Sequence, residues 1–157
     1  MTRKRPGASS SLDDVSKAII EQLQQDGRRS YAAIGKEVGL SEAAVRQRVQ
    51  RLIDSGVMQV VAVTDPLELG FARQAMIGIR VEGPIDPVAD AVAALDEVDY
   101  VVVTAGTYDL LVEVVAESDE HLLNLISGRI RAIPGVAATE TFMYLKLQKQ
   151  SYAWGVR

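Results

Sequence analysis

The sequence predicts an α+β fold in two parts: an N-terminal helix-turn-helix and a C-terminal domain with the ferredoxin-like order β-α-β-β-α-β. Up to Gly56, apolar residues recur every three or four positions, which is the helical period; after it, β-branched runs alternate with helical stretches. The charge also divides there, because residues 1–56 carry ten Lys/Arg against seven Asp/Glu and residues 57–157 carry seven against fourteen. Such asymmetry favours a part that faces a polyanion, joined to a part with another role.

Three helices are predicted in the first half, at about residues 12–26, 31–38 and 41–54. Each begins with side chains that can cap it and is followed by a glycine. A short second helix, a glycine turn and a longer third helix are typical of a helix-turn-helix, whose last helix enters the major groove of DNA. The capping candidates are Ser11 to Asp14, Ser30 and Ser41; the glycines are Gly27, Gly39 and Gly56; and the third helix turns Val45, Val49, Leu52 and Ile53 inward.

The outward residues of the third helix are the candidates for contact with DNA. Arginine can grip guanine or phosphate through its planar fork, and glutamine can pair with adenine. The alternative is an ordinary solvated face on three packed helices that contact protein. Within a basic tail at 1–11, which we expect to be disordered, Arg3 to Arg5 can instead act as an arm on phosphates or a minor groove. The DNA-binding candidates are Ser41, Glu42, Ala44, Arg46, Gln47, Arg48 and Arg51.

The second half begins with a β-branched run at 57–64, predicted to be a strand that completes the first domain (12–64), and a linker at 65–73. A second domain, predicted to bind a ligand and to form oligomers, then spans 74–157. We expect its two helices to cover one face of the sheet and a second copy to cover the other, so that a dimer presents two recognition helices to two half-sites. Strands are expected at about 76–82, 100–105, 110–116 and 136–147, and helices start at Asp86 and Asp119.

A further signal is the order and spacing of several short segments. They are Leu12-Asp13-Asp14, Asp26-Gly27-Arg28-Arg29, Gly39-Leu40-Ser41, Val45 with Arg48, Val49 and Leu52, Gly56-Val57, Gly106-Thr107-Tyr108-Asp109-Leu110, Pro134-Gly135-Val136 and Thr139-Glu140-Thr141. Over about residues 12–147 the chain resembles the Lrp/AsnC (leucine-responsive, feast/famine) family of prokaryotic transcriptional regulators. The resemblance implies a winged helix-turn-helix, a RAM/ACT-like regulatory domain, and dimers that often form octamers. The segment 151–157, with Trp154, falls outside the pattern and is expected to pack on a neighbour.

The resemblance also implies sequence-specific DNA binding that responds, in affinity or oligomeric state, to an amino-acid effector. In the family the effector cleft lies between subunits at the turn that is here 106–109. A glycine lets backbone N–H groups approach a carboxylate, and Asp109 can pair with an ammonium. The alternative is that hairpin turns simply favour Gly and Asp. The effector-binding candidates are Tyr100, Thr104, Gly106, Thr107, Tyr108, Asp109, Thr139 and Thr141.

Composition argues against other classes of protein. The chain has no cysteine, so disulfides, thiolate metal sites and cysteine nucleophiles are excluded. With neither a secretory signal nor a run of ~20 apolar residues, we expect a cytoplasmic protein without a membrane partner. We expect no metal, no cofactor and no enzymatic activity, since the consecutive residues Asp119, Glu120 and His121 point in different directions on a helix. An architectural protein that organises DNA with little sequence choice is the main alternative function.

Overall fold

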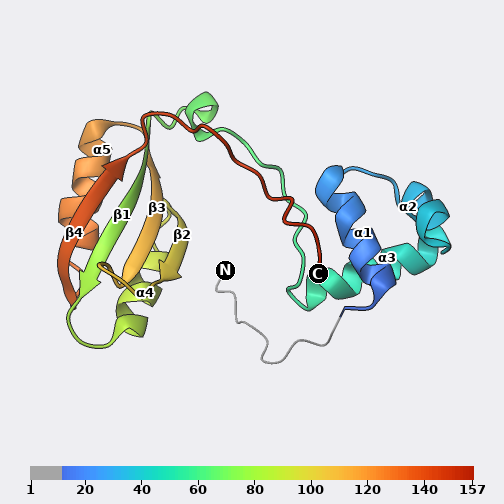
Figure 1. The fold of residues 1–157 in the computed structure, drawn as a ribbon. Helices are drawn as coiled ribbons and strands as arrows, with labels where there is room; N and C mark the ends of the chain where they lie inside the picture. Colours follow the sequence, from blue (N-terminus) through green and yellow to red (C-terminus); the bar gives the residue numbers. More distant parts are fainter. Residues whose placement is uncertain (1–11) are drawn as a thin grey trace. The chain divides into compact units, whose positions relative to one another are not determined.

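The computed structural model describes residues 12–157, which form two compact units (Figure 1). The basic residues Arg3 to Arg5 lie outside the described part of the chain. A helical unit contains the residues up to 63, and a sheet unit contains 64–148. The last nine residues, 149–157, group with the helical unit, although the sequence places them with the regulatory domain.

The helical unit consists of α1 (Asp14–Gln25), α2 (Tyr31–Val38) and α3 (Glu42–Asp54). Each helix is capped by the side chain just before it, which accepts a hydrogen bond from a backbone N–H three residues on. The caps at Ser30 and Ser41 are as predicted, and Asp13 is the one among residues 11–14 that caps α1. Ile53, expected to face inward, is exposed. The core of the unit is Ile19, Leu23, Ile34, Val45 and Val49.

The turn between α2 and α3 is held by a close backbone approach. Gly39 ends α2 in the left-handed region (φ 71°), and the N–H of Leu40 donates to the carbonyl of Gly35 at 2.9 Å. A Cβ on Gly35 would lie 2.4 Å from the carbonyl oxygen of Leu40, a distance that real Cβ atoms do not reach. Glycine at position 35 therefore lets the chain turn tightly enough to pack α3 on α2.

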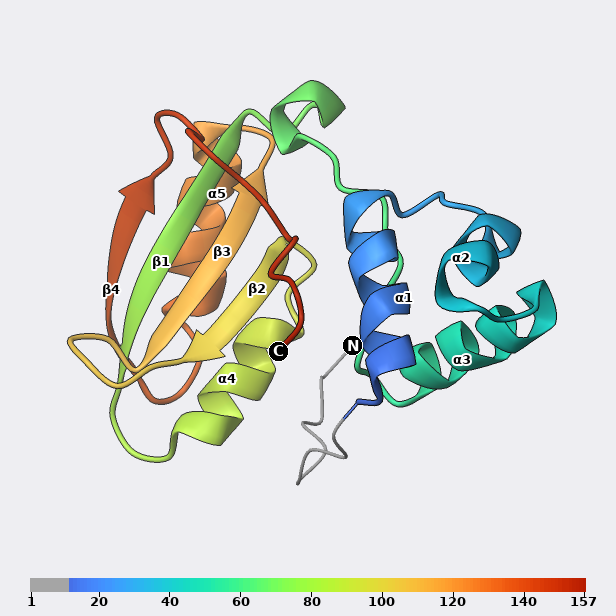
Figure 2. The ribbon, with the colours of Figure 1, turned by 45° about the vertical axis from the view of Figure 1, so that its right-hand side comes forward.

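The sheet unit has four antiparallel strands in the spatial order β2-β3-β1-β4, which confirms the ferredoxin-like prediction. Helices α4 and α5 cover the same face of the sheet (Figure 2). The core between them is formed by alternate strand residues such as Ile77, Ile79 and Val112, packed on Val88 and Leu125. The elements are β1 (Arg73–Val81), α4 (Ile85–Ala93), β2 (Val98–Val103), β3 (Leu110–Ala116), α5 (Asp119–Asn124), which continues as a π-helix (Leu125–Ile130), and β4 (Val136–Met143).

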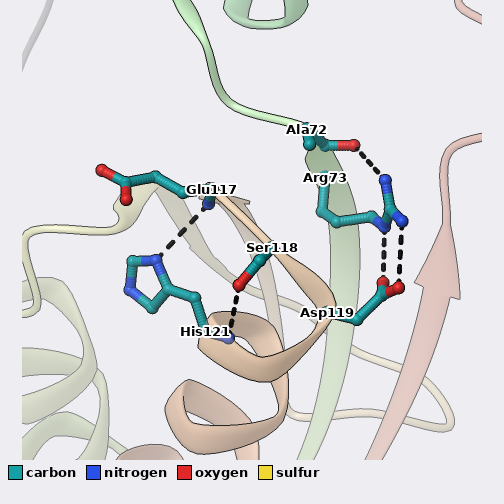
Figure 3. Close-up of polar contacts among 6 residues, drawn as sticks. All are labelled: Ala72, Arg73, Glu117, Ser118, Asp119 and His121. Carbon is teal, nitrogen blue, oxygen red and sulfur yellow. Dashed lines mark hydrogen bonds and ion pairs between the residues drawn. The ribbon is translucent and has the colours of Figure 1, made fainter.

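Polar contacts tie the start of α5 to the sheet (Figure 3). Arg73, at the first position of β1, donates to both carboxylate oxygens of Asp119 at 2.5 and 2.9 Å, which holds the pKa of Asp119 below its usual range. Ser118 caps the helix, and Nδ1 of His121 accepts from the N–H of Glu117 at 3.4 Å. Asp119 and His121 therefore bind different partners, and each has a structural role at the start of α5.

The prediction of a strand at 57–64 is wrong. Within the described residues, α3 is therefore not followed by the strand that would form a wing. The segment has no regular structure, and its residues 59–64 form no backbone hydrogen bonds with any residue of 12–157. A strand needs a neighbour for its N–H and C=O groups, and β-branched composition alone does not supply one. The other boundaries shift by a few residues: β1 starts at Arg73 and β4 ends at Met143.

No helix in the part of the chain that is described is both long and apolar enough to span a bilayer.

Candidate functional site

Helix α3 buries one face and exposes the other. Arg46 lies on the exposed face, where its guanidinium is 2.7 Å from Glu42 and stacks 5.2 Å above the ring of Tyr31. Gln47 and Arg51 are also exposed, and Nε of Arg51 donates weakly to the carbonyl of Gln47 at 3.4 Å. Together these side chains form a polar surface that can donate hydrogen bonds to DNA.

Three other candidates on α3 have local roles. Ser41 caps the helix through its hydroxyl, and Ala44 is half-buried. Arg48 is directed at α1: its NH1 donates to Oδ2 of Asp13 at 2.6 Å and to Oγ of Ser16 at 3.1 Å. These hydrogen bonds, with those from Ser16, lower the pKa of Asp13 from 3.8 to about 2. The structure thus separates Arg48 from the exposed arginines with which the sequence grouped it.

On the sheet unit, Tyr108 occupies the face that the helices leave open. Its ring lies flat over Gly78, where a Cβ would come within 2.8 Å of three ring atoms. The ring also meets Phe142 edge to face, with 6.0 Å between ring centroids, and its hydroxyl donates to Glu140. The hydrogen bond to the Glu140 carboxylate raises the pKa of Tyr108. The tyrosine ring can therefore pack on the sheet because residue 78 is a glycine and has no Cβ.

A hollow of about 300 Å³ lies beside Tyr108. It contains one cationic side chain, Arg80, and one anionic side chain, Glu140, which come from adjacent strands β1 and β4. Thr107 from the predicted turn borders it as well. The full lining is Arg80, Thr107, Tyr108, Ala138, Thr139 and Glu140.

The predicted turn at 106–109 is fixed by bonds within the chain. The Thr104 hydroxyl donates to the carbonyl of Tyr108 at 2.6 Å, and Oδ2 of Asp109 accepts from the N–H of Val81 at 2.7 Å. One Asp109 oxygen is therefore occupied in joining β3 to β1. Gly106 is exposed, and a Cβ there would meet nothing within 4 Å, so the chain itself does not require glycine at this position.

Of the remaining effector candidates, Thr139 lines the hollow, whereas Thr141 and Tyr100 do not. Strand register places Thr139 opposite Ile79 and Thr141 opposite Ile77, so both side chains share the helix-covered face with those core residues. Thr139 nevertheless borders the hollow. Tyr100 pairs with Glu113 on the open face, but it lies on the edge strand β2, which β3 separates from β1, and it does not line the hollow.

The comparisons with known proteins agree with this architecture. Residues 12–53 match an AsnC-type helix-turn-helix domain, and residues 71–157 match an AsnC-type regulatory domain described as a C-terminal dimeric alpha+beta barrel domain. The chain belongs to the Lrp/AsnC family. It is a transcriptional regulator with a helix-turn-helix DNA-binding domain and an AsnC-type regulatory domain.

Named Lrp/AsnC relatives match over nearly their full lengths. The transcriptional regulator FL11 of Pyrococcus furiosus is 37% identical over 142 residues, covering 89% of this chain and 93% of FL11. The leucine response regulatory protein LrpA of Mycobacterium tuberculosis shares 28% identity and a TM-score of 0.81, covering 88% and 96% of the two chains. A transcriptional regulator of Neisseria meningitidis solved with L-Met shares the fold, with 22% identity, a TM-score of 0.77 and coverage of 91% and 96%.

Sequence reasoning on this Lrp/AsnC chain missed Gly78, Arg80 and Glu140 as neighbours of the predicted turn. Glycine and arginine alternate with the apolar residues of β1, which is a period-2 signal that these positions share the open face. Glu140 lies between the two threonines that were selected. Strand register is needed to bring β1, β4 and the turn together, and register is not readable from one strand at a time.

Proposed function

We propose that the chain binds duplex DNA with sequence preference through the exposed face of α3, as a homodimer whose regulatory domains bind an amino acid. The observation that supports the DNA interface most is the free presentation of Arg46, Gln47 and Arg51 opposite the buried stripe of α3. Arg46 is held by Tyr31 and Glu42 at the start of the helix, where a recognition helix contacts base edges. Little side-chain entropy then remains to be lost on binding.

A homodimer follows from the open face of the sheet. Phe142, on β4, is 44% exposed and Tyr100, on β2, is 52% exposed, so large aromatic side chains remain exposed at both edges of that face. A second copy would cover it, and the dimeric barrel in the description of the matching domain supports this choice. Two copies would present two α3 helices to two half-sites of one duplex.

Competition binding tests the DNA proposal against the architectural alternative. A duplex selected by the chain from a random-sequence pool is labelled, bound, and challenged with unlabelled random duplex at a stated salt concentration. We expect the complex to contain two chains and to survive a ~1,000-fold excess of random competitor, since specific sites bind at least that much more tightly. Equal competition by the random duplex would instead favour the architectural function.

The hollow beside Tyr108 supports the amino-acid effector. An amino acid carries a carboxylate and an ammonium, and the hollow offers Arg80 to the first and Glu140 to the second. Its volume of about 300 Å³ suits one small molecule. Asp109 is a weaker partner for the ammonium because it does not line the hollow. The Neisseria neighbour solved with L-Met supports this ligand class.

Replacing Arg80 by methionine should abolish the response to the effector, because methionine keeps the aliphatic stem and removes the group that binds the carboxylate. The measurement is a thermal-shift screen of the twenty amino acids, in which at least one should raise the melting temperature of the wild-type chain. The matched control is Arg131→Met, an exposed arginine outside the hollow, which should respond like the wild type. If Arg80→Met responded like the wild type, the hollow would not be the effector site.

A further inference from the structure

We propose that Arg48 is a positioning residue: by binding Asp13 it fixes α3 against the start of α1, and it does not contact DNA. The inference rests on the proposed DNA binding by α3. It assigns one of the predicted DNA-binding arginines to a contact between two helices of the helical unit.

The two carboxylate oxygens of Asp13 accept hydrogen bonds from two different helices, α1 and α3. Oδ1 accepts from the N–H of Ser16 at 2.7 Å and so caps α1, while Oδ2 accepts from NH1 of Arg48 at 2.6 Å. The same nitrogen of Arg48 donates to Oγ of Ser16, which is buried at 8% exposure, at 3.1 Å. The cap of the first helix and the middle of α3 are thus joined in one set of hydrogen bonds.

Helical spacing explains why Arg48 differs from the other arginines. It lies three residues after Val45 and four before Leu52, so it shares their inward face. Its side chain is 27% exposed, whereas that of Arg46 is 64% exposed. The hydrogen bond from Arg48 is also the main cause of the lowered pKa of Asp13, as expected for a carboxylate paired with this guanidinium.

The two roles for Arg48 predict opposite results when Asp13 is neutralised. A DNA-contacting Arg48 would be released by the change and would be free to reach a phosphate or base. A positioning Arg48 would lose its partner, and α3 would be less well held. Asp13→Asn makes the distinction cleanly, because asparagine still caps a helix as well as aspartate does but carries no charge.

We expect Asp13→Asn to weaken binding to the selected duplex by about three- to tenfold, although it adds net positive charge to the unit. The control is Asp14→Asn, which removes a charge from the neighbouring, fully exposed carboxylate, whose one ion pair within residues 12–157 is with Lys17 at 4.0 Å. It should leave affinity unchanged or slightly higher. Unchanged or tighter binding by Asp13→Asn would overturn the proposal.

Arg48→Met supplies an independent readout through the salt dependence of binding. A positioning role predicts the same loss of affinity as in Asp13→Asn, an unchanged slope of log affinity against log salt, and no further loss in the double variant. A lost phosphate contact would reduce the slope by about one and would overturn the proposal.

Melting temperatures separate this inference from the proposed function. Should the wild-type chain bind no duplex at all, the proposed function fails. Equal and non-additive drops in melting temperature for Asp13→Asn and Arg48→Met would still support the link between α1 and α3, whereas additive drops would overturn it.

Discussion

Replacing Arg46 and Arg51 together by alanine is expected to raise the dissociation constant for the selected duplex by about 30-fold or more. Each arginine that contacts a base or phosphate contributes about 1–3 kcal/mol, and these two are the exposed arginines of α3. Titration of labelled duplex at fixed salt measures the effect. The fold should survive because neither side chain belongs to the core of the helical unit.

The control for this pair removes the same charge elsewhere. Arg131 and Lys146 are exposed on the sheet unit, and their double replacement by alanine should change affinity by less than about threefold. If the control weakens binding as much as the α3 pair does, attraction by overall charge explains the affinity, and α3 is not the interface.

Alanine at position 35 should destabilise the helical unit by about 1–3 kcal/mol, because the new Cβ collides with backbone, which shifts at a higher cost than the end of a flexible side chain. The direction of this change in stability is informative, because helix propensity alone predicts that Gly→Ala within a helix stabilises the protein by ~1 kcal/mol. The atom that the Cβ meets is the carbonyl oxygen of Leu40, at 2.4 Å. Relief would require moving the turn that places α3, so DNA affinity should also fall.

Thermal unfolding followed by circular dichroism measures this effect, and a loss of 1 kcal/mol corresponds to about 4–8 °C in a unit of this size. Gly27→Ala is the matched control in the same unit, because a Cβ there has only the carbonyl oxygen of Leu23 in reach, at 3.8 Å. It should melt like the wild type. A Gly35→Ala variant that melts at or above the wild-type temperature would contradict the close approach of residue 35 to the backbone of Leu40.

Features decided by local chemistry were predictable from the sequence. The caps at Ser30 and Ser41 and the glycine after α2 depend on residues a few positions apart. The order of strands and helices followed from the change in apolar period, and the ferredoxin-like sheet followed from that order. The family resemblance was carried by segments of this local kind.

Features decided by tertiary partners were not predictable in this way. Arg48 looks like Arg46 in the sequence, and only the approach of Asp13 separates them. The residues at 57–64 have the composition of a strand but pair with no strand among residues 12–157. Alternation along β4 divides its residues between two faces, and only pairing with β1 shows that Glu140, rather than Thr141, faces Tyr108.

A single cysteine placed on α3 tests the central claim most directly, since the chain has none of its own. Gln47→Cys, labelled with an iron chelate that cleaves nearby DNA, should cut the selected duplex at two sites about one helical turn apart, one for each α3 of a dimer. The same label on Glu120→Cys, an exposed position at the start of α5, should leave the duplex largely uncut. Cleavage from Glu120 but not from Gln47 would contradict the assignment of α3 as the surface that reads DNA.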